Sequence, residues 1–226
     1  MDTIKRFLPK GIYCKRKIII ILILILIITI SIITTIPKTS KKIKGKIFYL
    51  EPKNANNSST IQRTLIKKPK DNAYSISLFI NIKDWYDDFQ KWKHVYHIGS
   101  KVKDGEKINW KNVPFQSPGL WLSPRINNMR FVFSTHDNHK VKHRYMDIED
   151  IPINKVFNVT IVANFTSLTI FIDGKLSKTL LLSETPIFSC GNMYLNYNGG
   201  FNGTIQKLQY FDRELSIREI KSISKL

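Results

Sequence analysis

The feature that most constrains this chain is an uncharged, Ile-rich run over residues 18–36, in which the polar side chains are those of Thr29, Ser31, Thr34 and Thr35. At a rise of about 1.5 Å per residue, the run makes a helix of about 28 Å, close to the roughly 30 Å of a bilayer's hydrocarbon core. In lipid, a lone segment satisfies its backbone hydrogen bonds internally only as a helix. The run therefore predicts one transmembrane helix over residues 18–36.

The competing interpretation of this run is a cleaved signal peptide. The apolar region of such a peptide normally has about 7–15 residues and ends in small residues. This run is longer, and it is followed directly by Pro37 and Lys38 without a small residue at its exit. Both features favour an uncleaved anchor.

Basic residues flank the run on both sides, so the positive-inside rule says little about orientation. Residues 1–17 form a basic tail, and lysines also follow the run. Orientation is instead suggested by N-glycosylation sequons further along the chain. We therefore expect a cytosolic N-terminus and an extracytoplasmic C-terminal domain. The sequon asparagines are Asn56, Asn57, Asn158, Asn164 and Asn202, and the expected glycan acceptors are Asn57, Asn158, Asn164 and Asn202.

The chain carries a net charge of +19. Residues 1–17 contribute six basic side chains and Asp2, which leaves +14 on the remainder. A positive field of this kind attracts polyanions such as acidic glycans or anionic lipid headgroups. The lysines are scattered in an Ile-, Lys- and Asn-rich chain, so a purely compositional origin of the charge stays open. No basic stripe alternates with aromatic residues, and we expect no specific nucleic-acid binding.

Composition changes at about residue 70. Residues 37–70 contain Pro37, Pro52 and Pro69 and a polar stretch, and we interpret them as a tether in which residues 46–50 form one edge strand. Beyond residue 70, apolar and polar residues alternate with the period of a strand. The predicted strands cover residues 74–82, 129–134, 157–165 and 168–172, with an Asp173-Gly174 hairpin turn and a closing helix capped by Ser216 and Glu219. The pattern predicts an all-β antiparallel sandwich over residues 71–226.

In its second half, this domain resembles the concanavalin A-like jelly roll in its laminin-G-like form. The strand VFNVTIVANF, the hairpin SLTIFIDGKLSKTL, the segment MYLNYNGGFNGTIQKLQYFDREL and the ending LSIREI follow one another in family order. Upstream, YSISLFINI and GLWLSPRINNMRFVFST resemble the first core strand and the paired central strands. One departure is Phe157, which stands where the family usually has Trp. The resemblance implies a jelly roll that displays a binding surface.

Some members of that superfamily hydrolyse β-glucans, which requires two carboxylates on one strand face. This chain lacks the Glu-x-Asp-x-x-Glu motif of those enzymes, and Glu149 and Asp150 are adjacent and would point to opposite faces. We therefore predict that the protein is not an enzyme. The lone anchor and the Ile-, Lys- and Asn-rich composition, which is typical of an AT-rich gene, also resemble surface proteins of large DNA viruses. This resemblance suggests a virion membrane as one location.

Metal binding has two candidate groups, and neither matches a standard ligand spacing. His136, Asp137, His139 and His143 cluster in one predicted turn, where a solvated polar loop is the alternative interpretation. Many laminin-G-like domains bind calcium through oxygen atoms, and the resemblance therefore makes Asp104, Asp137 or Asn198 candidate ligands. No ligand set follows from the sequence, and no other cofactor is expected.

The strongest ligand-binding candidate is the aromatic segment that contains Trp85, Tyr86, Asp88 and Trp92. Aromatic faces stack on sugar rings, and carboxylates accept hydrogen bonds from sugar hydroxyls. The alternative is that Trp85 and Trp92 pack into the sandwich. A second, weaker candidate is Tyr197 with Asn198, next to the turn at Gly199.

These features favour a non-catalytic, membrane-displayed binding or adhesion module that recognises carbohydrate or a protein surface. The alternative is a structural envelope protein that has no small-ligand site.

Overall fold

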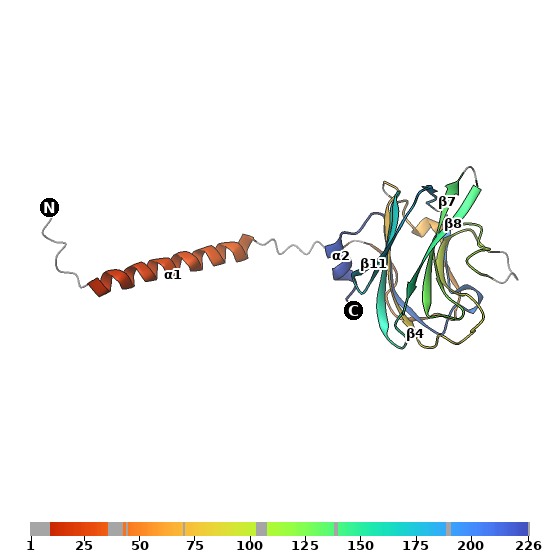
Figure 1. Ribbon diagram of the computed structural model, residues 1–226, viewed down its shortest axis with the longest axis horizontal. Coiled ribbons are helices and arrows are strands. Elements are labelled where there is room, and N and C mark those ends of the chain that lie inside the picture. The colour runs from red at the N-terminus through yellow and green to blue at the C-terminus, as the bar shows by residue number, and fades with distance from the viewer. Residues whose placement is uncertain are drawn as a thin grey trace. The chain divides into compact units, whose positions relative to one another are not determined.

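The computed structural model describes residues 10–35, 43, 45–69, 71–102, 108–137, 140–188 and 191–225. The chain divides into two compact units, residues 1–42 and residues 43–226. In the first unit, α1 (Lys10–Thr35) is a single helix (Figure 1). Its described side chains, those of residues 18–29 and 31, are exposed. Residues 18–35 of the predicted segment are helical, and Ile36 lies outside the described residues.

Within the described part of the chain, no helix is both long enough and apolar enough to cross a membrane. The membrane anchor stays a prediction from the sequence, and so do the orientation and the cytosolic location of residues 1–17.

The second unit contains two seven-stranded antiparallel sheets packed face to face (Figure 1). Sheet A has the order β1 (Lys46–Tyr49), β14 (Gly203–Phe211), β4 (Tyr74–Ile82), β9 (Val156–Ala163), β10 (Ser167–Ile172) and β11 (Lys175–Leu181), with β2 (Lys53–Asn54) also paired to β14. Sheet B has the order β12 (Thr185–Pro186), β7 (Asn128–Asp137), β6 (Gln116–Leu122), β5 (Lys93–Gly99), β13 (Asn192–Leu195) and β3 (Ser59–Ile61), with β8 (Lys140–Glu149) also paired to β7. The predicted all-β, jelly-roll-like sandwich is confirmed.

Alternation along the strands supplies the core between the sheets. Ile76, Leu78 and Ile80 of β4 are fully buried there, and Phe131 and Phe133 of β7 face them from sheet B. The residues between these positions point to the opposite faces of the sheets. The outer face of sheet B carries its own apolar cluster, formed by Val102, Ile108, Trp110, Val113, Trp121 and Val132.

Short helices complete the second unit. They are η1 (Arg63–Leu65), η2 (Tyr197–Gly199) and α2 (Ile217–Ile223). The predicted capping box is present at α2, where the backbone N–H of Glu219 donates to the Ser216 side chain and the Glu219 carboxylate accepts from the Ser216 backbone N–H. Hydrogen bonds from Arg213 lower the pKa of Glu219 to about 2, with smaller contributions from Ser216. The inner side of α2 covers sheet A through Ile220, which packs with Phe171 and Phe211.

The predicted tether over residues 37–70 is corrected by the structure. Residues 46–61 form β1, β2 and β3, so the folded unit begins at Ile43 instead of residue 71. The edge strand predicted at residues 46–50 is confirmed as β1. The other two strands are only two and three residues long, and they pair with β14 and β13 far along the chain. Local composition carries no signal for such pairing.

Replacing Phe157 tests whether this residue is part of the core between the sheets. Phe157 is 1% exposed and packs in the main core. We expect Phe157→Ala to lower the free energy of unfolding by about 3–5 kcal/mol, because it removes buried apolar surface and leaves a cavity. Denaturant unfolding measures this change. The matched control is Tyr86→Ala, at a side chain that is 70% exposed, for which a change of at most about 0.5 kcal/mol is expected. Equal effects of the two variants would contradict the assignment.

Candidate functional site

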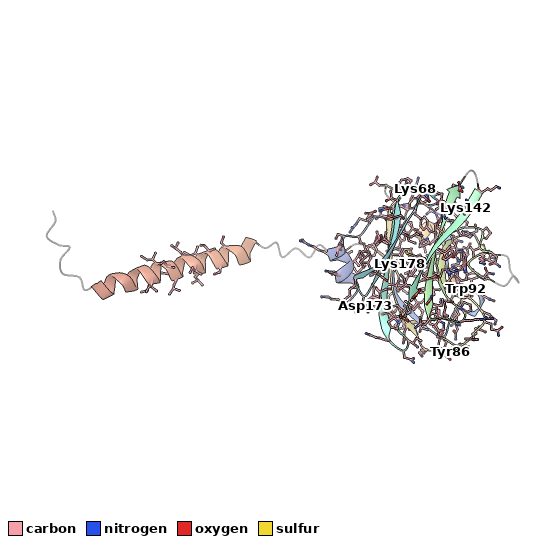
Figure 2. The ribbon with its side chains drawn as sticks, viewed as in Figure 1. Lys68, Tyr86, Trp92, Lys142, Asp173 and Lys178 are labelled. Carbon is pink, nitrogen blue, oxygen red and sulfur yellow. The ribbon has the colours of Figure 1, made fainter. Side chains whose placement is uncertain are left out.

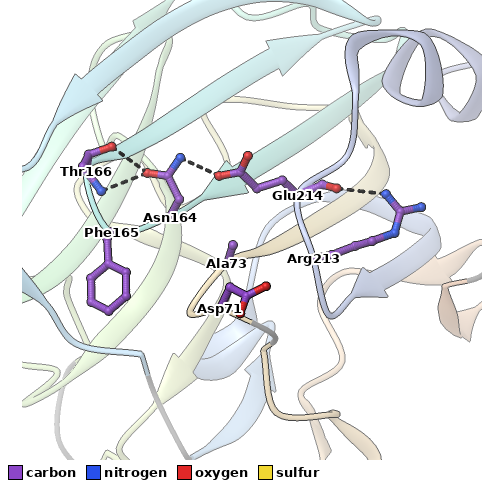
Figure 3. A pocket seen from close by; sticks show the side chains of 7 residues that line it. All are labelled: Asp71, Ala73, Asn164, Phe165, Thr166, Arg213 and Glu214. Atoms are coloured by element: carbon purple, nitrogen blue, oxygen red, sulfur yellow. Dashed lines mark hydrogen bonds between the residues drawn. The ribbon is translucent and has the colours of Figure 1, made fainter.

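A pocket of about 550 Å³ lies at one edge of sheet A (Figure 3). Three segments distant in sequence line it: the residues that precede β4, the turn between β9 and β10, and the connection from β14 to α2. The lining residues are Asp71, Ala73, Asn164, Phe165, Thr166, Arg213 and Glu214. We call it the Phe165 pocket.

Strand register brings these three segments together. Tyr74, at the start of β4, pairs with Ala163 at the end of β9. Ser75 pairs with Phe211 at the end of β14. β4 begins where its two neighbours, β9 and β14, end. The loops that flank these three strands therefore converge at that end of the sheet. The pocket is thus a direct consequence of the antiparallel order of sheet A.

Asn164 fixes the polar rim of the Phe165 pocket (Figure 3). Its Oδ1 accepts hydrogen bonds from the backbone N–H groups of Thr166 (2.9 Å) and Ser167 (2.8 Å). Its Nδ2 donates to Glu214 Oε1 at 2.5 Å. The guanidinium of Arg213 is held by Glu219 at 2.5 and 3.0 Å. The rim is therefore ordered before any ligand arrives.

The chemistry of the Phe165 pocket combines one aromatic ring with carboxylates. Phe165 is 48% exposed, and its ring meets Phe188 edge to face at 5.5 Å. Asp71 and Glu214 supply acceptors for hydroxyl groups, and Thr166 supplies a hydroxyl. An exposed ring beside convergent polar groups is a pattern that suits sugar rings. No local sequence pattern marks this pocket, because its residues lie on three separate segments.

The outer face of sheet B carries a second aromatic group, centred on Arg130. The Arg130 guanidinium lies 4.7 Å from the ring centroids of Trp92 and Trp110 and 4.0 Å from that of Tyr145. It also donates two hydrogen bonds to Asp147, at 2.7 and 2.6 Å. The space between the rings is thus filled by a side chain of the protein itself. The cluster holds loops against sheet B and does not offer an open aromatic platform.

The structure separates the residues of the predicted aromatic segment. Trp85 is 2% exposed and lies in the main core, which corrects its assignment as a ligand-binding residue and agrees with the packing alternative. Trp92 packs into the Arg130 cluster. Tyr86 is 70% exposed at the surface (Figure 2) and lies beside Phe89, with ring centroids 5.8 Å apart. Of the predicted aromatic residues here, Tyr86 is the one open to a ligand.

The acidic residues of this segment surround a buried cation. Lys93 is 2% exposed, and burial lowers the pKa of its ammonium group. Asp88, Asp87 and Asp84 act in the opposite direction and favour the charged form. Asp88 also forms an ion pair with Lys91 at 2.8 Å. The carboxylates therefore have an internal electrostatic role, which the sequence alone did not reveal.

The second predicted candidate lies at η2. Tyr197 packs against the apolar cluster of sheet B together with Trp92, and its hydroxyl is 2.9 Å from Thr60 Oγ1. The structure thus brings Trp92 and Tyr197 onto one cluster, although they are far apart in the sequence. Asn198 is exposed and has a left-handed backbone, with φ of 55°.

A buried pair of histidines, His94 and His97, is hydrogen-bonded to η2. The Tyr197 backbone N–H donates to His94 Nδ1 at 3.0 Å, which places the proton of the neutral His94 ring on Nε2. His94 Nε2 lies 2.8 Å from His97 Nδ1, and His97 Nε2 donates to the Ser100 carbonyl at 2.9 Å. This directional chain requires both rings to be neutral. Burial lowers the pKa of His94 well below its usual value, and His97 lowers it further.

The sequon asparagines differ in accessibility. Asn57 is exposed, and Asn164 and Asn202 are partly exposed. Asn158 is fully buried; its Nδ2 donates to Ser77 Oγ (2.9 Å), and its Oδ1 accepts from Thr160. A glycan at Asn158 is incompatible with this packing, which corrects its assignment as an acceptor. Alternating strand position explains the error, because Asn158 faces a covered part of sheet A.

The candidate metal residues do not form a ligand cluster in the described chain. His143 Nδ1 lies 3.1 Å from Ser134 Oγ, and His143 Nε2 lies 3.0 Å from the Val113 carbonyl. Asp137 forms an ion pair with Lys142. Among the residues that the structure describes, no group of three His, Cys, Asp or Glu side chains is placed to hold a metal ion. His139 and Asp104 lie outside the described residues.

Comparisons with known proteins identify the fold and not a family. No family model and no curated protein matches this chain. The chain is similar to the binding domain of botulinum neurotoxin serotype D, with 15% identity over 70% of this chain and 36% of that chain and a TM-score of 0.51. It is also similar to the receptor-binding domain of the botulinum neurotoxin C/D mosaic serotype, with 14% identity over 82% and 47% of the two chains and a TM-score of 0.53. The chain spans less than half the length of either, and the likeness concerns the fold alone.

Substituting Arg130 tests whether the cluster on sheet B depends on its planar guanidinium. Arg130→Lys keeps the charge but loses the paired hydrogen bonds to Asp147 and the stacking on three rings. We expect it to lower the free energy of unfolding by about 1–3 kcal/mol. Thermal or denaturant unfolding measures the loss. The matched control is the exposed Arg125, where Arg125→Lys should change stability by at most about 0.5 kcal/mol. A loss no greater than that of the control would refute the structural role.

The buried histidines predict acid-sensitive stability. Burial lowers the pKa of His97 from 6.5 to about 4, opposed by its hydrogen bond to Ser100. The unfolded chain therefore takes up the proton first, so this stability is fully present above pH 6.5 and is lost as the pH falls toward 4. The loss corresponds to about 3 kcal/mol. Unfolding measured between pH 7 and pH 5 should show a shallower slope in His97→Gln than in the wild type. Equal slopes would exclude His97 as the source.

Proposed function

We propose that this protein is a non-catalytic binding module, displayed on a membrane, that recognises carbohydrate at the Phe165 pocket. The observation that carries the proposal is the pocket itself, where an exposed aromatic ring lies beside an ordered rim of amide and carboxylate groups. Carbohydrate recognition needs such a ring for stacking and fixed hydrogen-bonding groups for orientation.

The fold supports a binding role as well. Two solved domains of similar fold are described as a binding domain and a receptor-binding domain. The sequence resemblance to concanavalin A-like, laminin-G-like jelly rolls favours the same class of function. Residues 43–226 carry 27 basic and 16 acidic side chains, a net charge of +11 that draws anionic ligands toward the domain.

Membrane display is the part of the proposal that is supported by the sequence of residues 18–36. An uncharged run of that length is typical of an anchor. The exposed sequon at Asn57 favours an extracytoplasmic position for the folded unit, with the N-terminus cytosolic. A virion membrane is one compartment that fits this arrangement.

A glycan array probed with the full chain in detergent tests carbohydrate recognition. The ionic strength is physiological, which screens non-specific attraction, and calcium is included in one arm and omitted in the other. We expect selective binding that Phe165→Ala weakens about tenfold, because the ring no longer stacks on the ligand. Glu214→Gln should also weaken binding, since it replaces a charged acceptor in the rim.

The matched control for Phe165→Ala is Leu181→Ala, which removes an apolar side chain that is 78% exposed and does not line the pocket. Binding by this variant should equal that of the wild type. Binding to every polyanion alike, or to no glycan at all, would contradict carbohydrate recognition. That outcome would favour the alternative, a structural envelope protein.

A further inference from the structure

The donor groups on the rim of the Phe165 pocket are engaged within the protein. The Thr166 hydroxyl donates to Asn164 Oδ1 at 3.0 Å, and Asn164 Nδ2 donates to Glu214 Oε1 at 2.5 Å. Arg213, the one basic lining residue, donates through Nη1 to the Glu214 carbonyl at 2.9 Å. A ligand therefore meets few free donors at this rim.

Two carboxylates of the pocket stay available as acceptors. Asp71 is exposed, and within the described part of the chain its carboxylate forms no hydrogen bond or ion pair. Glu214 is also exposed, and its bond to Asn164 uses only one of its two carboxylate oxygens. Figure 3 shows both side chains at the pocket, with the Phe165 ring to their left. A ligand that enters from solvent can therefore reach both carboxylates.

Arg213 leaves these two carboxylates uncompensated, because its charge is already paired. The guanidinium donates to both carboxylate oxygens of Glu219, at 3.0 and 2.5 Å. Asp71, Glu214 and Glu219 against Arg213 give this part of the surface a net charge of −2. The folded unit as a whole carries +11. The Phe165 pocket is thus an acidic place on a basic domain.

These open groups set the chemistry that a ligand needs. A carboxylate accepts hydrogen bonds from hydroxyl and ammonium groups, but it repels an oxyanion, which has no proton to donate and carries the same charge. A hydrogen bond from an ammonium group to a carboxylate is stronger than one from a neutral hydroxyl. The exposed Phe165 ring adds a surface on which a sugar ring can stack. A sugar that carries a protonated amino group meets all of these conditions.

We propose that the Phe165 pocket prefers amino sugars with a free amino group to neutral sugars, and that it discriminates against acidic sugars. This inference rests on the proposed carbohydrate recognition and adds to it the class of sugar. The charge of the whole domain predicts the opposite order, because a positive field favours acidic sugars. The order of affinities therefore separates the local chemistry of the pocket from the field of the domain.

The test is a ligand-detected NMR titration of the full chain. The protein is produced in a host without N-glycosylation, so that Asn164 stays unmodified, and is purified in a detergent without a sugar head group. The probes are the methyl glycosides of glucose, glucosamine and glucuronic acid, and the matching galactose series. At about pH 6.5 the amino group is mainly protonated. In at least one series, we expect the amino sugar to bind about fivefold tighter than the neutral sugar, and the uronic acid at least fivefold weaker.

The variants Asp71→Asn and Glu214→Gln each remove one charge with little change of shape. In each, the preference for the amino sugar over the neutral sugar should fall to about twofold. The comparison uses this ratio because Glu214→Gln also weakens binding of the neutral sugar. Asn tolerates the left-handed backbone of Asp71, whose φ is 50°.

The matched control is Glu149→Gln, which removes an exposed carboxylate that does not line the pocket. Its ratio should equal that of the wild type. Raising the salt concentration to about 1 M should bring the wild-type ratio close to one, because the charges are then screened within about 3 Å.

The outcomes separate this inference from the proposed function. Saturable binding of a neutral sugar without a gain for the amino sugar, or with tighter binding of the uronic acid, would refute the preference and leave carbohydrate recognition in place. An equal fall of the ratio in Glu149→Gln would assign the preference to the general charge of the domain and would also refute it. No saturable binding of any probe would overturn both proposals.

Discussion

The pairing of β4 with β9 on one side and with β14 on the other is the constraint on which the rest of the second unit depends. β14 is the last strand of the chain, so this pairing joins sequence positions more than 120 residues apart. The register that buries Ile76, Leu78 and Ile80 also brings the ends of all three strands to one edge. A slip by one residue would turn the apolar side chains outward and separate the loops that form the Phe165 pocket.

The outer face of sheet B buries polar side chains. His94, His97 and Arg130 all lie on that face, and each is engaged by hydrogen bonds or by aromatic rings. Leaving buried polar groups unpaired is costly, so the hydrogen bonds and ring contacts of these three side chains stabilise the face. The proposed ligand recognition therefore uses the loops at the strand ends, where the Phe165 pocket lies.

Local patterns predicted the elements that are specified by a few neighbouring residues. β4 covers the predicted residues 74–82, the Asp173-Gly174 turn joins β10 to β11, and the capping box opens α2. Each depends on alternation, on a turn dipeptide or on a short cap, all of which are written within a few residues. β2 and β3 were not predicted, because strands of two and three residues show no clear alternation and are stabilised by pairing with β14 and β13.

The candidate sites were harder to predict for the same reason. Trp85 and Trp92 were candidate ligand residues because they are aromatic. Large aromatic side chains, however, also pack readily into a core or against a cation. The Phe165 pocket needs Asp71, Asn164 and Glu214 together, and only the sheet register shows that these residues meet. No local pattern distinguishes them from ordinary loop residues.

The structure also links two expectations that the sequence treats as independent. Asn164, which lines the Phe165 pocket, is also a sequon asparagine. A glycan is attached through the side-chain nitrogen, and at Asn164 that nitrogen donates to Glu214. A glycan on Asn164 would extend from a rim atom of the Phe165 pocket, beside the hydrogen bond to Glu214. If Asn164 carries a glycan, that glycan and a ligand of the Phe165 pocket would compete for the same volume, so the two expectations are not independent.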